Sequence, residues 1–223
     1  MKRKLLVQAC TKFFAGLVTV GLLLFVSAGT LSYWKGWLFM MALFIPMLLA
    51  GIVLWVKSPN LLAKRLNATE TEPEQKRVIM VSSFMMVGGL VVAGLDFRLG
   101  WSSLPDWLSA AATAVFLVSY GLYAEVMREN AYLSRTVQVQ EGQKVVDTGL
   151  YGMVRHPMYF ATLFLFLSIP VILGSVYAWI VFLIYPFLLV KRIKNEEAVL
   201  VKGLAGYEDY RKKVKYRLLP FIW

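Results

Sequence analysis

The sequence predicts an all-α, polytopic integral membrane protein with four transmembrane helices and a C-terminal helical hairpin, or five to six membrane segments. Three observations predict this fold class: the apolar composition, five long uncharged runs and an uneven distribution of basic residues. Hydrophobic residues make up 59% of the 223-residue chain, and the mean hydropathy is +0.63. Both values are well above those of soluble domains.

The first four uncharged runs occupy residues 13–34, 36–56, 78–95 and 107–124. A helix rises about 1.5 Å per residue, so about 20 residues cross a hydrocarbon core of about 30 Å. Each run therefore predicts a transmembrane helix, and buried helices of a soluble protein explain four such runs poorly. In the third run Gly88, Gly89 and Gly94 predict close helix packing, because small residues let two backbones approach.

The fifth run, residues 157–190, is too long for one straight crossing, because 34 helical residues would reach about 50 Å. Pro170, Gly174 and Ser175 interrupt its middle. We therefore expect a helical hairpin with arms at about residues 158–169 and 176–190. One kinked, strongly tilted helix is the alternative.

The basic residues predict the orientation. If the runs alternate sides and the fifth is a hairpin, 22 of the 24 Lys and Arg residues fall on one side, and Lys35 and Arg98 fall on the other. The positive-inside rule then places both termini and the loop from Arg128 to Arg155 in the cytoplasm. The net charge of +11 is spread along this rim, which indicates attraction to the lipid bilayer rather than to nucleic acid.

The chain divides near residue 128. We expect residues 1–127 to form the transmembrane scaffold and the substrate-facing part, and residues 128–223 to form the catalytic, cofactor-binding part. Residues 61–77 are expected to form a short surface helix that ends near Pro73. The short loops suggest a bacterial or archaeal inner membrane. The single cysteine, Cys10, excludes an internal disulfide and a cysteine metal cluster, and we expect no metal.

Polar side chains gather at both ends of the fifth run. Pro157 suits the first position of a helix, which puts Arg155 and His156 at a helix N-terminus that can hold a carboxylate or phosphate. On the second arm, Arg192 and Glu196 are four residues apart and share a helix face. If the arms meet, ionisable groups form a cluster at the membrane interface, consisting of Arg155, His156, Tyr159, Arg192, Glu196 and Glu197.

Each of these residues also has a structural explanation. A single histidine near an interface is often a capping or hydrogen-bonding residue. An arginine and a glutamate four residues apart usually form a surface pair that contributes a few tenths of a kcal/mol. Tyr207 and Tyr210 would then only anchor the tail among the lipid headgroups.

Five segments together resemble one enzyme family. They are residues 143–151 (QKVVDTGLY), residues 154–159 (VRHPMY), Arg192 with the pair Glu196-Glu197, residues 206–210 (GYEDY) and residues 217–223 (RLLPFIW). Over about residues 135–223 the chain resembles the isoprenylcysteine carboxyl methyltransferases. Phospholipid N-methyltransferases share this architecture, and sterol reductases that use NADPH share a similar Arg-His-x-x-Tyr element and tail. The Glu196-Glu197 pair is closer to the methyltransferase branch.

The resemblance implies that the cofactor is S-adenosylmethionine and that Arg192 binds the substrate. Gln143 stands where the family usually has histidine. The implied cofactor-binding residues are Gln143, Lys144, Val145, Val146, Tyr151, His156, Pro157, Met158, Tyr159 and Glu196.

We therefore expect a membrane methyltransferase with Arg192, Glu197 and Arg155 as its catalytic residues. The substrate would be lipophilic and most simply a prenylcysteine-like carboxylate, which is ionised at neutral pH and needs no base. An amine or thiol would need Glu197 or His156 as the base. The alternatives are an NADPH-dependent reductase of unsaturated lipids or sterols, a phospholipid N-methyltransferase, and a non-catalytic membrane scaffold.

Overall fold

The computed structural model describes residues 2–66, 70, 72–134 and 136–223. Regular structure in this part of the chain is helical, as predicted. Five of its stretches are long and apolar enough to cross a membrane, which defines an integral membrane protein. They are α1 (Lys2–Ala28), α2 (Trp34–Lys57), α4 (Pro73–Leu99), α5 (Asp106–Glu129) and the stretch Val176–Gly203.

The predicted C-terminal hairpin is confirmed. Its first arm is α6 (Pro157–Ile172), and its second arm consists of α7 (Val176–Phe182) and α8 (Tyr185–Gly203). The chain reverses at Gly174, whose φ of 77° lies in the left-handed region that favours glycine. Ser175 then caps α7, because its hydroxyl accepts a hydrogen bond from the Ala178 amide at 3.0 Å.

The expected arm boundaries were too short. Pro170 does not break the first arm but lies inside the last turn of α6, where the loss of one backbone hydrogen bond does not end the helix. The second arm continues to Gly203, well beyond the uncharged run. Its last turns therefore carry charged side chains away from the apolar part of the bundle.

The surface helix expected over residues 61–77 has the wrong boundaries. The structure has α3 (Pro59–Leu66) and then starts α4 at Pro73. Proline is favoured at the first helical position because its missing N–H would be unpaired there anyway. Pro73 is thus a start signal, not a stop signal. Residues 67–69 and 71, which join the two helices, are outside the described part.

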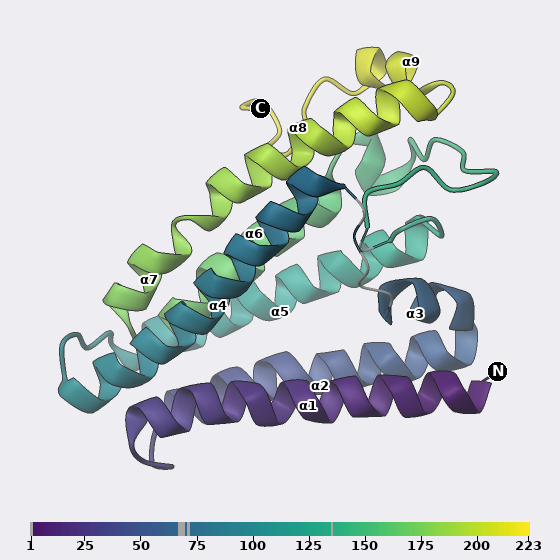
Figure 1. Cartoon of the computed structure of the whole chain (residues 1–223). Coiled ribbons are helices and arrows are strands. Elements are labelled where there is room, and N and C mark those ends of the chain that lie inside the picture. The colour runs from purple at the N-terminus through teal and green to yellow at the C-terminus, as the bar shows by residue number, and fades with distance from the viewer. Residues whose placement is uncertain (1, 67–69, 71, 135) are drawn as a thin grey trace.

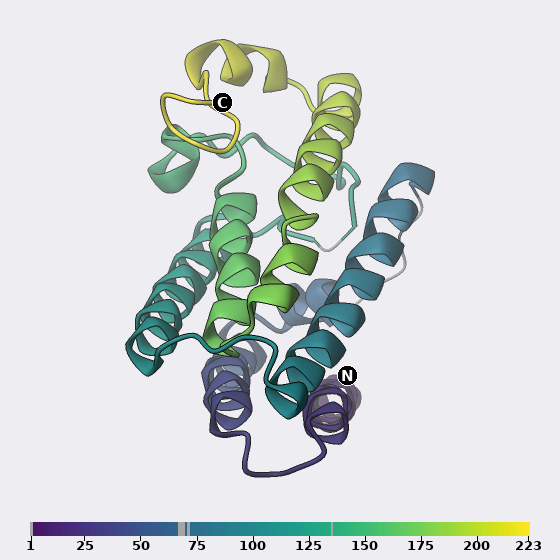
Figure 2. The same ribbon diagram turned by 90° about the vertical axis from the view of Figure 1, so that its left-hand side faces the viewer.

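The helices form two groups, the α1–α2 pair and the bundle of α4, α5 and the hairpin (Figures 1 and 2). In Figure 2, α6 and the second hairpin arm lie between α5 and α4, and the α1–α2 pair lies below them. We call one end of the bundle the basic end; it holds the N-terminus, α3, the start of α4, the end of α5 and α9 (Tyr207–Lys213). The hairpin turn at Gly174 lies at the opposite end, close to Lys35. This arrangement agrees with the predicted segregation of basic residues.

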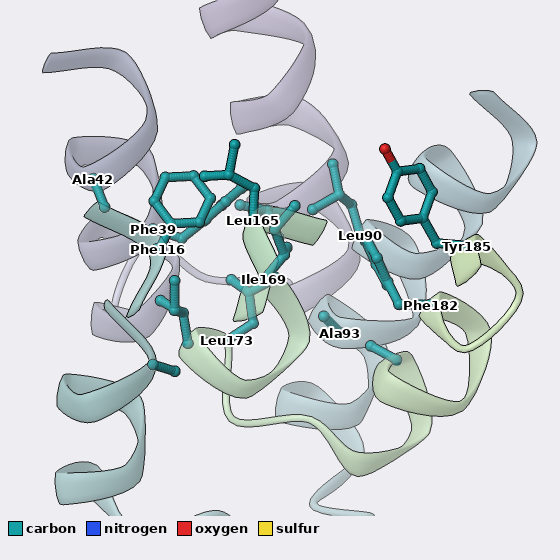
Figure 3. Packing of buried hydrophobic residues seen from close by; sticks show 14 of the residues in the cluster. Phe39, Ala42, Leu90, Ala93, Phe116, Leu165, Ile169, Leu173, Phe182 and Tyr185 are labelled. Carbon is teal, nitrogen blue, oxygen red and sulfur yellow. The ribbon is translucent and has the colours of Figure 1, made fainter. Parts of the chain in front are cut away.

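Aromatic and aliphatic side chains from α2, α4, α5 and the hairpin fill the core (Figure 3). Phe39 and Phe116 join α2 to α5 with ring centroids 6.1 Å apart. The close packing expected at two glycines is confirmed. A Cβ at Gly94 would lie 2.7 Å from the Leu24 carbonyl oxygen, and one at Gly89 would lie 2.3 Å from the Phe182 ring. A Cβ at Gly88 would meet nothing within 4 Å, so the expectation is wrong there.

Apolar side chains also cover the outside of the bundle. On α1, for example, Phe14, Val18, Leu22 and Val26 recur every fourth residue and are all exposed. A helix that presents such a row to solvent would aggregate in water, whereas in a bilayer the row contacts lipid tails.

Candidate functional site

The Arg155–Pro157 junction is fixed by the C-terminal tail. Pro157 is the first residue of α6, as predicted, and the His156 carbonyl oxygen accepts hydrogen bonds from the first turn of this helix. The Arg155 amide donates to the Tyr216 carbonyl oxygen and the His156 amide donates to that of Arg217, both at 2.9 Å. The tail therefore runs alongside the junction and sets the backbone position of both residues.

Glu197 lies at the centre of a buried ion cluster. Its Oε1 is 2.7 Å from Arg155 Nε and 3.4 Å from His156 Nε2, and its Oε2 is 2.8 Å from Arg217 Nε. Arg155 also donates from Nη1 to the carbonyl oxygens of Val214 and Lys215, at 2.7 and 2.9 Å. Arg155 and Glu197 thus join α8 to the tail. Their assignment as catalytic residues stays a prediction that these contacts do not favour.

Arg192, Tyr159 and Glu196 form a second cluster beside the first. The Tyr159 hydroxyl donates to Glu196 Oε2 and accepts a hydrogen bond from Arg192 Nε at 2.8 Å. The Arg192 guanidinium also lies 5.7 Å from the centre of the Tyr159 ring. The hairpin therefore brings together all six ionisable or tyrosine residues that the sequence analysis grouped. It does so by joining α6 to α8 through side chains on their facing surfaces.

A polar cavity of about 100 Å³ lies between these clusters and the segment 130–146. Its lining contains every residue that the resemblance assigned to the cofactor, and also Arg155 and Arg192. Glu197 is not part of the lining. The assigned residues at this cavity are Gln143, Lys144, Val145, Val146, Tyr151, His156, Pro157, Met158, Tyr159 and Glu196. The cofactor roles of these residues stay a prediction, because their position alone does not identify a ligand.

The wall of the cavity is held by contacts at η1 (Gly149–Gly152), a 3₁₀ turn. The Glu129 carboxylate, at the end of α5, accepts a hydrogen bond from the Leu150 amide at 3.1 Å. Gly149 has a φ of 52°, and a Cβ there would lie 1.6 Å from Glu129 Oε1, so only glycine fits. Asn130 Nδ2 donates to the Tyr151 hydroxyl at 2.9 Å. These contacts fix Tyr151 against the end of α5.

The structural alternative for Tyr207 and Tyr210, an anchor of the tail among lipid headgroups, does not fit, because both residues are buried and line the cavity. The Tyr210 hydroxyl donates to the Tyr151 carbonyl oxygen at 2.8 Å. Burial raises the pKa of Tyr151 to about 12 and also raises the pKa values of Tyr207 and Tyr210. All three therefore stay neutral at physiological pH. The hydroxyls of Tyr151 and Tyr210 make hydrogen bonds, and all three residues line the cavity.

Several other residues that line the cavity were not predicted from the sequence. Asn130, Tyr132, Ser134 and Thr136 come from the segment after α5, and Leu200 and Leu204 come from the end of α8. The first group lies in irregular structure without hydrophobic periodicity, so only its polar composition after an apolar helix could have indicated it. Leu200 lies four residues after Glu196 and thus shares its helix face.

A second, more apolar cavity of about 490 Å³ lies between α4, α6 and α8. Side chains such as Val78, Met86 and Leu188 line it. Four residues line both cavities, so they form the boundary between a polar and an apolar compartment: Ser134, Met158, Tyr159 and Arg192. Arg192 is therefore placed where a polar ligand and an apolar ligand would meet.

The polar cavity has a mixed charge. Among the described residues that line it, Glu196 is the one carboxylate, and Lys144, Arg155 and Arg192 are the arginines and lysines. The charge of Arg155 is compensated by Glu197. A ligand with both a cationic and a carboxylate group fits this set, because Glu196 and the tyrosine rings suit the cation and Lys144 suits the carboxylate.

The fold and the site define an integral membrane protein whose helical hairpin places a polar pocket beside an apolar groove. Residues 110–202 match the model of the isoprenylcysteine carboxyl methyltransferase (ICMT) family, so this part of the chain is similar to that family. The resemblance found in the sequence is thereby confirmed. The matched region covers most of α5, the junction and both arms of the hairpin.

The curated relatives are named for a different reaction, the reduction of sterols. The chain is 32% identical over 91 residues to a Delta(14)-sterol reductase of Mus musculus, a match that covers 40% of this chain and 22% of the relative. It is 27% identical over 135 residues to the Delta(14)-sterol reductase of Methylotuvimicrobium alcaliphilum, covering 54% and 32%. A Delta(14)-sterol reductase of Schizosaccharomyces pombe is 30% identical over 90 residues, covering 39% and 21%. The chain thus spans at most about a third of the length of these relatives.

Proposed function

We propose that this membrane enzyme transfers a methyl group from S-adenosylmethionine to a lipophilic acceptor, most simply a prenylcysteine-like carboxylate. The observation that carries the proposal is the meeting of two compartments at Tyr159 and Arg192. One compartment is polar and contains the Glu196 carboxylate, and the other is apolar and lies between α4, α6 and α8. By its polarity such a pair suits a water-soluble cofactor and a membrane-soluble substrate, and the polar cavity of about 100 Å³ would have to widen to admit a whole cofactor.

The polar pocket would hold the cofactor through its charges and its tyrosines. When bound, S-adenosylmethionine supplies an electrophilic methyl group on a sulfonium centre. The Glu196 carboxylate, oriented by the Tyr159 hydroxyl, would attract a cationic part of the ligand. The rings of Tyr151, Tyr207 and Tyr210 would add aromatic contacts and keep water away.

Arg192 would position the acceptor. Its Nε is held by the Tyr159 hydroxyl, so the guanidinium has a defined place at the boundary between the two cavities. A carboxylate acceptor is ionised at neutral pH, so its oxygen can attack without prior loss of a proton. Arg192 therefore contributes by orienting the acceptor carboxylate, whose apolar part occupies the cavity between α4, α6 and α8.

Reduction of an unsaturated lipid or sterol with NADPH is the second candidate. It is favoured by the names of the curated relatives, and these comparisons support it better than they support methyl transfer. In this case Lys144 and Arg192 would face phosphate groups, and the apolar groove would hold a rigid lipid. The Glu196 carboxylate favours methyl transfer over reduction, because it would repel NADPH, which carries several negative charges.

An assay of both reactions on one preparation tests the proposal. Purified protein in detergent is incubated with a lipid extract and methyl-labelled S-adenosylmethionine, and separately with NADPH and a Δ14-unsaturated sterol. We expect a labelled lipid together with S-adenosylhomocysteine, and no oxidation of NADPH. Sterol-dependent oxidation of NADPH without any labelled product would replace methyl transfer by the second candidate. Inactivity in both assays, without binding of either cofactor, would favour the scaffold.

A further inference from the structure

A large groove lies away from the candidate site. It has a volume of about 910 Å³ and lies between α2 and α5, with α3 at its basic end. Ligand pockets usually span about 300–1,000 Å³, so this groove can hold a sizeable molecule. Phe39 and Phe116 close the contact between α2 and α5 nearer the opposite end. Figure 1 shows α3 between the basic ends of the two helices.

The groove is apolar along its length and polar at one end. Leu49 and Val53 from α2 and Leu117 from α5 line its apolar part, and all three are exposed. Lys57, Lys64 and Arg128 line the end that belongs to the basic end of the bundle. An apolar channel with a cationic rim at the membrane interface matches the two parts of a phospholipid.

The charges at the rim do not cancel. Arg128 pairs with Glu125 through Nε at 2.8 Å, so this arginine is compensated. Lys64 donates to the neutral Gln140 amide oxygen at 2.6 Å and keeps its charge. Within the described residues no carboxylate lies within ion-pair distance of Lys57, and none lines the groove. Two uncompensated lysines therefore face this end.

We propose that this groove binds one anionic phospholipid, with its acyl chains along α2 and α5 and its phosphate between Lys57 and Lys64. The apolar part alone would accept any lipid tail, so the two lysines make the site selective for a net negative headgroup. A zwitterionic lipid carries a cationic group of its own to the rim, so the two lysines contribute less to its binding free energy.

Native mass spectrometry of the purified protein tests the headgroup selectivity. The protein is mixed with equal amounts of phosphatidylglycerol and phosphatidylethanolamine that carry identical acyl chains. We expect preferential retention of phosphatidylglycerol, and an approximately fivefold lower affinity for it in Lys57→Gln, which corresponds to about 1 kcal/mol for one surface lysine. Lys4→Gln, which removes an exposed lysine of α1 that does not line the groove, should leave retention unchanged.

Substitutions at two glycines test whether the lipid binds in this groove. A Cβ at Gly121, which lines the groove, would meet nothing within 4 Å, so Gly121→Phe should obstruct the groove and abolish retention. Gly88 has equally open space on α4, outside the groove, and Gly88→Phe is the matched control. Equal retention of both lipids by the wild type, equal effects of Lys57→Gln and Lys4→Gln, or undiminished retention in Gly121→Phe would overturn the proposal. A dimer that Gly121→Phe dissociates would identify a second copy as the occupant and also overturn it.

Discussion

Glu196 and Arg192 both contact the Tyr159 hydroxyl, yet the proposed function gives them different tasks. Glu196→Gln removes the negative charge that would face a cationic cofactor, so we expect the affinity for S-adenosylhomocysteine to fall about ten- to a hundredfold, or about 1.5–3 kcal/mol. Arg192→Ala should leave this affinity nearly intact and lower the rate of methyl transfer. Cofactor titrations and turnover assays on both variants measure the two effects.

The exposed pair Glu125–Arg128 gives a control, because Glu125→Gln likewise removes the charge of a hydrogen-bonded glutamate, but one that does not line the polar cavity. It should change neither quantity. If Glu196→Gln and Arg192→Ala lose cofactor affinity equally and both melt at lower temperature, the cluster is purely structural and the division of roles is wrong.

Glu197 should matter for stability rather than for chemistry. Its carboxylate is buried between Arg155, Arg217 and His156, so Glu197→Gln would leave a buried arginine without its counter-charge. Breaking a buried ion pair from one side typically costs about 3–5 kcal/mol. We expect a marked loss of thermal stability in detergent, measured by intrinsic fluorescence. A stable variant that binds the cofactor but lacks turnover would instead support a catalytic Glu197.

At the scale of elements, the turn η1 connects α5 to the pocket, and Gly149 is its most constrained residue. Gly149→Ala must adopt a left-handed backbone, which costs about 1–2 kcal/mol, and it also drives a methyl group into the Glu129 carboxylate. Gly142 is a matched control, because its φ of 68° is similarly positive but a Cβ there would meet nothing within 4 Å.

Thermal unfolding and cofactor titration of both alanine variants distinguish strain from steric clash. We expect Gly149→Ala to lower the melting temperature more than Gly142→Ala does, and to weaken cofactor binding because Tyr151 shifts. Equal effects of the two substitutions would show that backbone strain alone decides, and that the Glu129 contact does not hold the pocket wall.

The helical hairpin and the polar cavity could be predicted from the sequence, but some of their details could not. Uncharged runs indicated the helices because their lengths match a bilayer, and the motif around Arg155–Tyr159 indicated the polar cavity. The grouping of Arg155 and His156 with Glu197 was predicted from the hairpin, but the part of Arg217 could not be foreseen, because this residue reaches Glu197 only when the tail folds back. The end of the first hairpin arm was predicted too early, because Pro170 is tolerated in the last turn of α6.

At the scale of the whole molecule, the distribution of basic residues predicts a cytoplasmic basic end. In a Cys10→Ser background, single cysteines at Ser103 and Glu141 place one thiol at each end of the bundle, and both positions are exposed. A membrane-impermeant maleimide should label the Ser103→Cys variant in intact cells and the Glu141→Cys variant only after lysis. The reverse pattern would invert the orientation, and equal labelling of both variants in intact cells would contradict the two-sided arrangement.

The identity of the cofactor decides the function of the molecule, and calorimetry on the purified protein measures it directly. S-adenosylhomocysteine and NADPH are titrated separately into the wild type and into Glu196→Gln. We expect micromolar binding of S-adenosylhomocysteine by the wild type, weaker binding by Glu196→Gln and no binding of NADPH. Binding of NADPH without any response to S-adenosylhomocysteine would contradict methyl transfer and assign the pocket to a reductase.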